Sequence, residues 1–231
     1  MPTLLIQLVW FALTIILYLV VKQFYLRYHK WWLMPMISVP AILITCIIVF
    51  RFHFEHYIEL SRWLIWLLGP ATISFAVPIY EKRKIIYQHW LIMSIGVLTG
   101  IVVSVSSSIL LAKLFHLSGE VQASLATRSI STPFAMMIAP KIGGSQELAA
   151  VFVILTGVFG MTVGQLMLAL LPVKTHLAKG SLFGAASHVC GTTKAMEMGL
   201  DIGVVSSLVT MLSGIATVFL YPVIVYVLNL L

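Results

Sequence analysis

Apolar segments about 20 residues long recur along this chain, and this recurrence limits its fold more than any other feature of the sequence. A helix needs about 20 mostly apolar residues to cross the hydrocarbon core of a bilayer. Four segments in the first half reach that length, with Arg62 as their one charged residue: 4–21, 32–50, 61–79 and 90–112. Because such segments follow one another, we expect an all-α fold, a polytopic transmembrane helical bundle.

The composition excludes a soluble fold. Of the 231 residues, 61% are hydrophobic and 9% are charged, whereas a soluble domain carries about 25% charged residues. The net charge of +7 does not indicate nucleic acid, because the basic residues stand mostly at the ends of apolar segments. In that position they orient a membrane protein and contact anionic headgroups. We therefore expect the lipid bilayer as a partner, and no nucleic acid.

Neither a metal centre nor an enzyme is expected. The cysteines, Cys46 and Cys190, lie in apolar stretches, where a free, buried thiol is the usual state. No histidine or cysteine stands at metal-ligand spacing, so we expect no metal and no cofactor. Ser187 and His188 are sequence neighbours whose side chains would point apart on a helix, and no Gly-x-Ser-x-Gly elbow occurs. The sequence predicts no catalytic residue.

Charges in the connections between segments predict the orientation. The connection 22–31 has three basic residues and no acidic one, and 80–89 has three basic residues against one acidic. The connections 51–60 and 113–120 have no basic excess. Since basic connections stay in the cytoplasm, both chain termini are expected outside. The location expected is the cell membrane, as a multi-pass protein of a bacterial plasma membrane.

The second half alternates clear spans with interrupted ones. Residues 146–171 and 203–229 form clear spans. The segment 121–140 is interrupted near Pro133, and 178–199 is interrupted near Gly191. We therefore expect six clear spans plus two broken or re-entrant segments. Together they make one integral membrane domain, 1–231, with a scaffold in 1–112 and a substrate site in 113–231.

Polar residues concentrate beside the two interruptions. A pair of interrupted helices is the best sequence indication of a substrate site in a membrane protein, and unwound helix ends offer free N–H groups and a positive dipole. With Arg128, such a site suits a small anion, particularly a carboxylate. The expected substrate-binding residues are Arg128, Ser129, Ser131, Thr132, Ser187, His188, Thr192, Thr193, Lys194 and Glu197, with helix breaks at Pro133 and Gly191.

Each of these residues also has a structural interpretation. Arg128 would serve as a lipid anchor near an interface, and Lys194 and Glu197 would simply pair along one helix face. Serine and threonine in membrane helices often bond only to the chain. His188 fits a structural histidine on a backbone carbonyl as well as a ligand contact. Glycine pairs such as Gly96–Gly100 permit close packing within one chain or in a homo-oligomer.

The same residues carry a resemblance to a known family. Leu68–Thr72 and Ala76–Tyr80 resemble its Gly-Pro-Ala-Thr and Ala-x-Pro-Leu-Tyr motifs, and Arg128–Met136 is similar to its Arg-Ser-Val-Thr-Thr-Pro segment. Gly184–Thr192 follows in the same order. The chain thus resembles the LrgB/CidB family of holin-like and antiholin-like membrane proteins, which also includes the plastidial glycolate/glycerate translocator.

The resemblance implies two alternative functions. One is transport of a small carboxylate, such as pyruvate or glycolate, through a midplane site formed by the two broken helices. The other is a holin-like or antiholin-like role that modulates murein hydrolase activity and lysis beside a small partner of the LrgA/CidA type. Holins make holes from small, simple spans, so the polar broken segments favour transport. Substrate identity and coupling ion stay open.

Overall fold

The computed structural model describes residues 2–28, 30–74 and 76–230, and within them it is helical, without a strand. The all-α expectation is confirmed. Four helices are long and apolar enough to cross a membrane: Leu4–Tyr28, Arg83–Leu114, Gln146–Leu170 and Leu200–Leu228. The apolar helix Pro35–Val49 is shorter. The expected number of six clear spans is therefore not confirmed.

Contacts divide the chain into two compact units, residues 1–70 and 71–231. The first unit contains α1 (Pro2–Tyr28), the 3-10 helix η1 (Trp31–Leu33), α2 (Pro35–Val49) and α3 (Phe54–Trp66). Trp10 and Val21 of α1 pack with Val39 and Leu43 of α2. The amide of Gln7 donates a hydrogen bond to the carboxylate of Glu59, which ties α1 to α3.

The segment 61–79, which we expected to be one span, is not confirmed as one continuous helix, because a turn at Leu67 interrupts it. Its described helices are the end of α3, then α4 (Leu68–Ser74) and α5 (Ala76–Glu81). Proline removes a helix hydrogen bond and clashes with the carbonyl four residues before it. The residue four before Pro70 is Trp66, where α3 ends. Pro70 thus accounts for the interruption between α3 and α4.

The second unit holds the long helices. They are α6 (Arg83–Leu114), α9 (Gln146–Leu170) and α11 (Leu200–Leu230), with α10 (His176–Met198) between the last two. Two short helices, α7 (Gly119–Ala126) and α8 (Thr132–Ile138), and the 3-10 helix η2 (Ala139–Ile142) join α6 to α9. The core includes Ile109 of α6, Val153 of α9 and Val209 of α11, all fully buried.

Helix α10, which joins α9 to α11, runs into the second unit and then turns back. Both of its ends therefore lie at the end of the unit where α11 begins. The first half of α10 runs beside the start of α11 in the same direction, because Gly180 lies against Val205 and Gly184 against Val209. The second half runs back, since Gly203 of α11 lies against Met196. His176 and Asp201, at the two ends of this stretch, are 4.0 Å apart. We call residues 175–199 the second hairpin.

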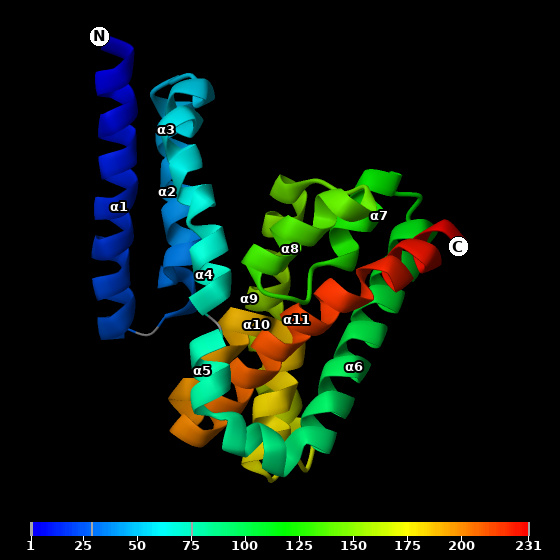
Figure 1. Ribbon diagram of the computed structural model, residues 1–231. Coiled ribbons are helices and arrows are strands. Elements are labelled where there is room, and N and C mark those ends of the chain that lie inside the picture. Colours follow the sequence, from blue (N-terminus) through cyan, green and yellow to red (C-terminus); the bar gives the residue numbers. More distant parts are fainter. Residues whose placement is uncertain (1, 29, 75, 231) are drawn as a thin grey trace. The chain divides into compact units, whose positions relative to one another are not determined.

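A similar return joins α6 to α9. The backbone N–H of Ser145, which precedes α9, donates a 2.9 Å hydrogen bond to Oγ of Ser124 in α7. The stretch therefore enters along α7, which packs on α6, and comes back along α8 and η2 (Figure 1). We call residues 118–145 the first hairpin. Because α9 runs the length of the unit between them, the two hairpins enter from opposite ends.

Candidate functional site

Arg128 lies at the tip of the first hairpin. Helix α7 ends at Ala126 and α8 begins at Thr132, so residues 127–131 lie outside both helices. Pro133 is in the first turn of α8, where proline is well accepted because that N–H has no helical partner. Our expectation of a break at Pro133 is therefore corrected: the break precedes this residue, which starts the next helix.

The guanidinium of Arg128 is held by serine hydroxyls. Its Nε donates to Oγ of Ser108 at 2.6 Å, one terminal nitrogen donates to Oγ of Ser107 at 3.2 Å, and the other to Oγ of Ser129 at 3.4 Å. Ser104 then donates to Ser129 at 2.6 Å. Within the described ranges, no Asp or Glu forms an ion pair with this guanidinium. Its positive charge thus lacks a counter-charge.

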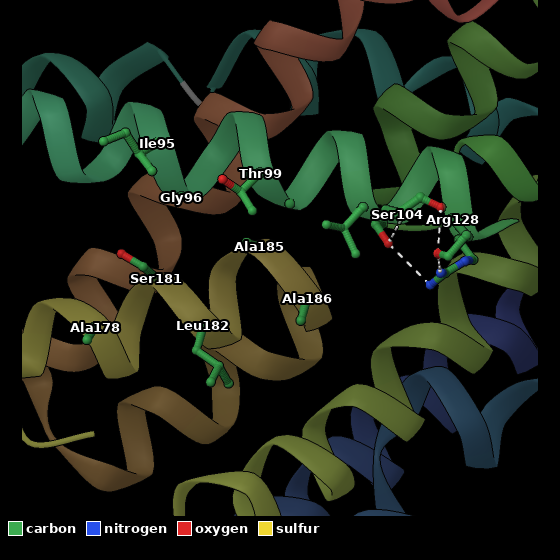
Figure 2. A pocket seen from close by; sticks show the side chains of 14 residues that line it. Ile95, Gly96, Thr99, Ser104, Arg128, Ala178, Ser181, Leu182, Ala185 and Ala186 are labelled. Carbon is green, nitrogen blue, oxygen red and sulfur yellow. Dashed lines mark hydrogen bonds between the residues drawn. The ribbon is translucent and has the colours of Figure 1, made fainter. Parts of the chain in front are cut away.

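This arginine closes one end of a pocket of about 600 Å³. Figure 2 shows the pocket between α6 and α10, with Arg128 and Ser104 toward one end and Ile95, Ala178 and Ser181 toward the other. We call it the Arg128 pocket. It is lined by Ile95, Gly96, Thr99, Gly100, Val103, Ser104, Ser107, Arg128, Ser129, Ala178, Ser181, Leu182, Ala185 and Ala186.

Small side chains and glycines bring α6 and α10 together along this pocket. A Cβ added to Gly100 would lie 3.0 Å from Cβ of Ala185, and one on Gly96 would lie 3.7 Å from Cβ of Ser181. The hydroxyl of Ser181 is buried and has no hydrogen-bond partner in the part of the chain that the structure describes. The pocket therefore combines one fixed cation, an apolar wall and an unused hydroxyl.

The second hairpin turns at His188. This residue has φ 39° and ψ −123°, while its neighbours in α10 are helical. We expected the break at Gly191, and that position is corrected. Gly191 is helical, and a Cβ there would lie 2.5 Å from the carbonyl oxygen of Phe183 and 2.6 Å from Cβ of Ser187. Glycine is needed there so that the two halves of α10 can lie against each other, not to break the helix.

The expected site residues divide into several groups. Arg128 and Ser129 line the Arg128 pocket. Ser187 does not, but its sequence neighbour Ala186 does. Ser131, Ser187 and His188 are fully buried and, in the described residues, have side-chain polar atoms without hydrogen-bond partners. Thr132 lies half-buried in the first turn of α8.

The other four expected residues are satisfied by their surroundings. Thr192 shares a 3.0 Å hydrogen bond with Ser206 of α11, and Thr193 bonds to the carbonyl of Val189 in its own helix. Lys194 and Glu197 form a 2.9 Å ion pair along one helix face. The observed ion pair therefore supports the structural interpretation of Lys194 and Glu197.

Sequence reasoning missed the partners that hold Arg128. Ser104, Ser107 and Ser108 lie inside a segment that was expected to be a plain span, and Thr99 and Ser181 line the same pocket. The available signal was the run Ser104-Val105-Ser106-Ser107-Ser108, which is unusually polar for the interior of a membrane helix. No fixed spacing linked that run to Arg128, which lies 20 residues further along the chain.

Comparisons with known proteins decide the family. The model of the LrgB-like family matches residues 14–227. The chain belongs to the LrgB-like family. It is 32% identical over 210 residues to YwbG of Bacillus subtilis, an uncharacterized protein, which covers 91% of this chain and 93% of the relative. A second uncharacterized protein of that organism, YxaC, is 31% identical over 226 residues, or 97% of this chain and 98% of the relative.

Staphylococcal relatives carry a functional name. The holin-like protein CidB of Staphylococcus epidermidis is 29% identical over 213 residues, covering 92% of this chain and 93% of the relative. The CidB protein of Staphylococcus aureus matches to the same extent. No solved structure matches this chain significantly. With its four membrane-length helices, this member of the LrgB-like family is a multi-pass membrane protein.

Proposed function

We propose that this protein carries a small anion, a carboxylate, across the membrane, and that the anion binds in the Arg128 pocket. The observation behind the proposal is the guanidinium of Arg128, which lines the pocket and contacts serine hydroxyls without a carboxylate partner. A central arginine costs about 2.5–3.5 kcal/mol on insertion scales. A carboxylate ligand would supply the missing counter-charge.

The serine partners support an anion over a purely structural arginine. Each of the three serines accepts a hydrogen bond from the guanidinium, so the group is fixed in orientation but not neutralised. A planar guanidinium can bind a carboxylate through two parallel hydrogen bonds, which a lysine cannot reproduce. Fixing the fork in advance reduces the conformational entropy lost when the anion binds.

The two hairpins support movement of the anion through the protein. Arg128 comes from the break in the first hairpin, and Ala185 and Ala186 come from the second hairpin just before its break. The two hairpins enter the second unit from opposite ends. Interrupted helices around one central site are the usual construction of secondary transporters. This arrangement supports a midplane site with access from each side in turn.

The second candidate is a holin-like role, and the comparisons favour it more directly. The staphylococcal relatives carry the name holin-like protein CidB. On this view the chain modulates murein hydrolase activity and lysis, together with a small LrgA/CidA-type membrane partner. The two candidates are compatible if lysis follows from altered metabolite balance, but they differ in molecular activity. A holin passes solutes through a hole, whereas a carrier binds one class of solute.

Purified protein in liposomes tests the proposal. We expect uptake of labelled pyruvate to saturate with concentration, to be inhibited by other small carboxylates, and to leave an entrapped fluorescent dye inside the liposomes. Protein-free liposomes are the control. Release of the dye together with unsaturable pyruvate entry would instead support the holin-like candidate and reject the carrier.

A further inference from the structure

His188 has a position that neither packing nor the Arg128 pocket explains. Its side chain is 1% exposed. Neither ring nitrogen has a hydrogen-bond partner of normal geometry in the described residues, and the backbone of Val153 offers only a weaker polar interaction. Burying polar groups without hydrogen bonds costs about 1–3 kcal/mol per group in proteins. The φ of 39° adds backbone strain that glycine would avoid.

The surroundings of His188 are shaped around its ring. A Cβ on Gly157 of α9 would lie 2.6 Å from Cε1 of His188 and 2.8 Å from Sγ of Cys190. A Cβ on Gly160 would lie 2.5 Å from Oγ of Ser187, which is also buried without a partner in the described chain. Two glycines of α9 thus leave room for a histidine and a serine whose side-chain polar atoms have no hydrogen bond of normal geometry in the described residues. This is a second polar centre, separate from the pocket lining.

Among the described residues, Arg128 is the charged group that interacts electrostatically with His188. Ala186, two residues before His188, lines the Arg128 pocket. On its own helix the nearest ionised side chains are Lys194 and Glu197, which neutralise each other. The helices packed against α10 carry titratable groups only toward their ends: Arg83, Lys84, Tyr87, His89 and Lys113 on α6, Glu147 on α9, and Asp201, Tyr221 and Tyr226 on α11. Cys190 is the one thiol beside the ring.

We propose that His188 is a proton-binding site that couples proton movement to anion movement. This inference rests on the proposed carrier function. In the empty protein, the charge of Arg128 opposes a second positive charge nearby. A carboxylate on Arg128 cancels that charge, so binding of the anion favours binding of a proton to His188, and by linkage the proton favours the anion. One anion and one proton then cross together without net charge.

The proton balance of this cycle is simple. The neutral imidazole takes a proton from water on the side where the anion enters, on the ring nitrogen that carries no hydrogen. It returns the same proton to water on the other side when the anion leaves. On uptake the N–H bond forms as an O–H bond of a hydronium ion breaks, and on release the N–H bond breaks as a water molecule takes the proton.

Proton flux measured with a pH dye inside liposomes tests the coupling. We expect an inward pyruvate gradient to acidify the lumen of liposomes that contain the wild-type protein. His188→Asn should abolish this acidification while pyruvate–pyruvate exchange continues, because Arg128 is retained and asparagine accepts a positive φ. His188→Gly, which relieves the strain completely, is a second variant with the same expected loss. His116→Asn, an exposed residue with φ 51°, is the matched control and should leave acidification unchanged.

The outcomes separate the two proposals. Saturable pyruvate uptake without acidification by the wild-type protein overturns the proton site alone. Acidification that persists in either His188 variant assigns the proton to another group and also overturns it. Absence of saturable uptake in the wild-type protein rejects the carrier function itself. If both variants fail to fold, the wild-type acidification and its response to an imposed pH gradient still decide whether a proton moves with the anion.

Discussion

Replacing Arg128 gives the sharpest test of the pocket because its contacts set the expected magnitude. Arg128→Ala removes the only full charge among the described residues that line the pocket. A carboxylate bound there would lose its counter-charge, at a cost of about 3–5 kcal/mol on the scale seen when a buried pair loses one partner. Since about 1.4 kcal/mol is a factor of ten, kcat/KM for pyruvate uptake should fall by roughly two to three and a half powers of ten.

The lysine variant distinguishes a binding site from a lipid anchor. Lysine keeps the charge but cannot donate at the same time toward Ser107, Ser108 and Ser129, which arginine contacts through three nitrogens. Loss of one charged hydrogen bond costs about 1.5–3 kcal/mol, so Arg128→Lys should keep about 1–10% of the kcat/KM. A lipid anchor would accept lysine without loss.

Uptake into liposomes at matched amounts of protein is the assay. Arg83→Ala is the control, because Arg83 is an exposed arginine at the start of α6 that donates a 2.9 Å hydrogen bond to the backbone carbonyl of Tyr80 and stacks over the ring of that residue. It should transport normally. Near-normal uptake by Arg128→Ala would remove Arg128 from the site and refute the reasoning above.

Three further predictions follow from particular contacts. Gly160→Val should lower the thermal midpoint by the equivalent of about 1–3 kcal/mol of overpacking, because its Cβ would lie 2.5 Å from Oγ of Ser187, whereas Gly119→Ala, with nothing within 4 Å, should not; equal midpoints would contradict the packing of α9 on α10. Thr192→Val should destabilise by about 0.5–1.5 kcal/mol through loss of its bonds to Ser206 and Thr210, without changing the KM for pyruvate, and a raised KM would place Thr192 in the site. A cysteine at Ser118 should react with an impermeant thiol reagent from outside the cell, and one at Lys174 only after the membrane is opened; the reverse pattern would invert the expected topology.

The breaks show what the sequence can and cannot predict about this fold. The interruption around Arg128 could be predicted from the sequence, because hydroxyl groups and a charge are energetically unfavourable inside a membrane helix. Pro70 was equally visible in the sequence, but the long apolar run around it led us to expect one continuous span over 61–79. The turn at His188 was placed three residues too late, since glycine, not histidine, is the usual residue at a positive φ.

The site itself depended on contacts that sequence spacing does not encode. Arg128 and Ser129 were expected in the site and line the pocket. The serines of α6 that hold the guanidinium come from another helix, and their pairing with it exists only after the first hairpin packs against α6. Thr192, Thr193, Lys194 and Glu197 looked equally polar in sequence. In the structure, their side chains form hydrogen bonds or an ion pair within α10 or with α11. The sequence alone does not show these contacts.

Substrate protection of a pocket cysteine tests the central claim most directly. Val103 lines the Arg128 pocket and is 60% exposed, so Val103→Cys should react with a small maleimide, with the modified peptide identified by mass spectrometry. Pyruvate should slow this reaction in a saturable way, and the same cysteine combined with Arg128→Ala should lose that protection. If pyruvate and other small carboxylates leave the labelling rate of Val103→Cys unchanged at any concentration, the pocket does not bind the anion and the account is contradicted.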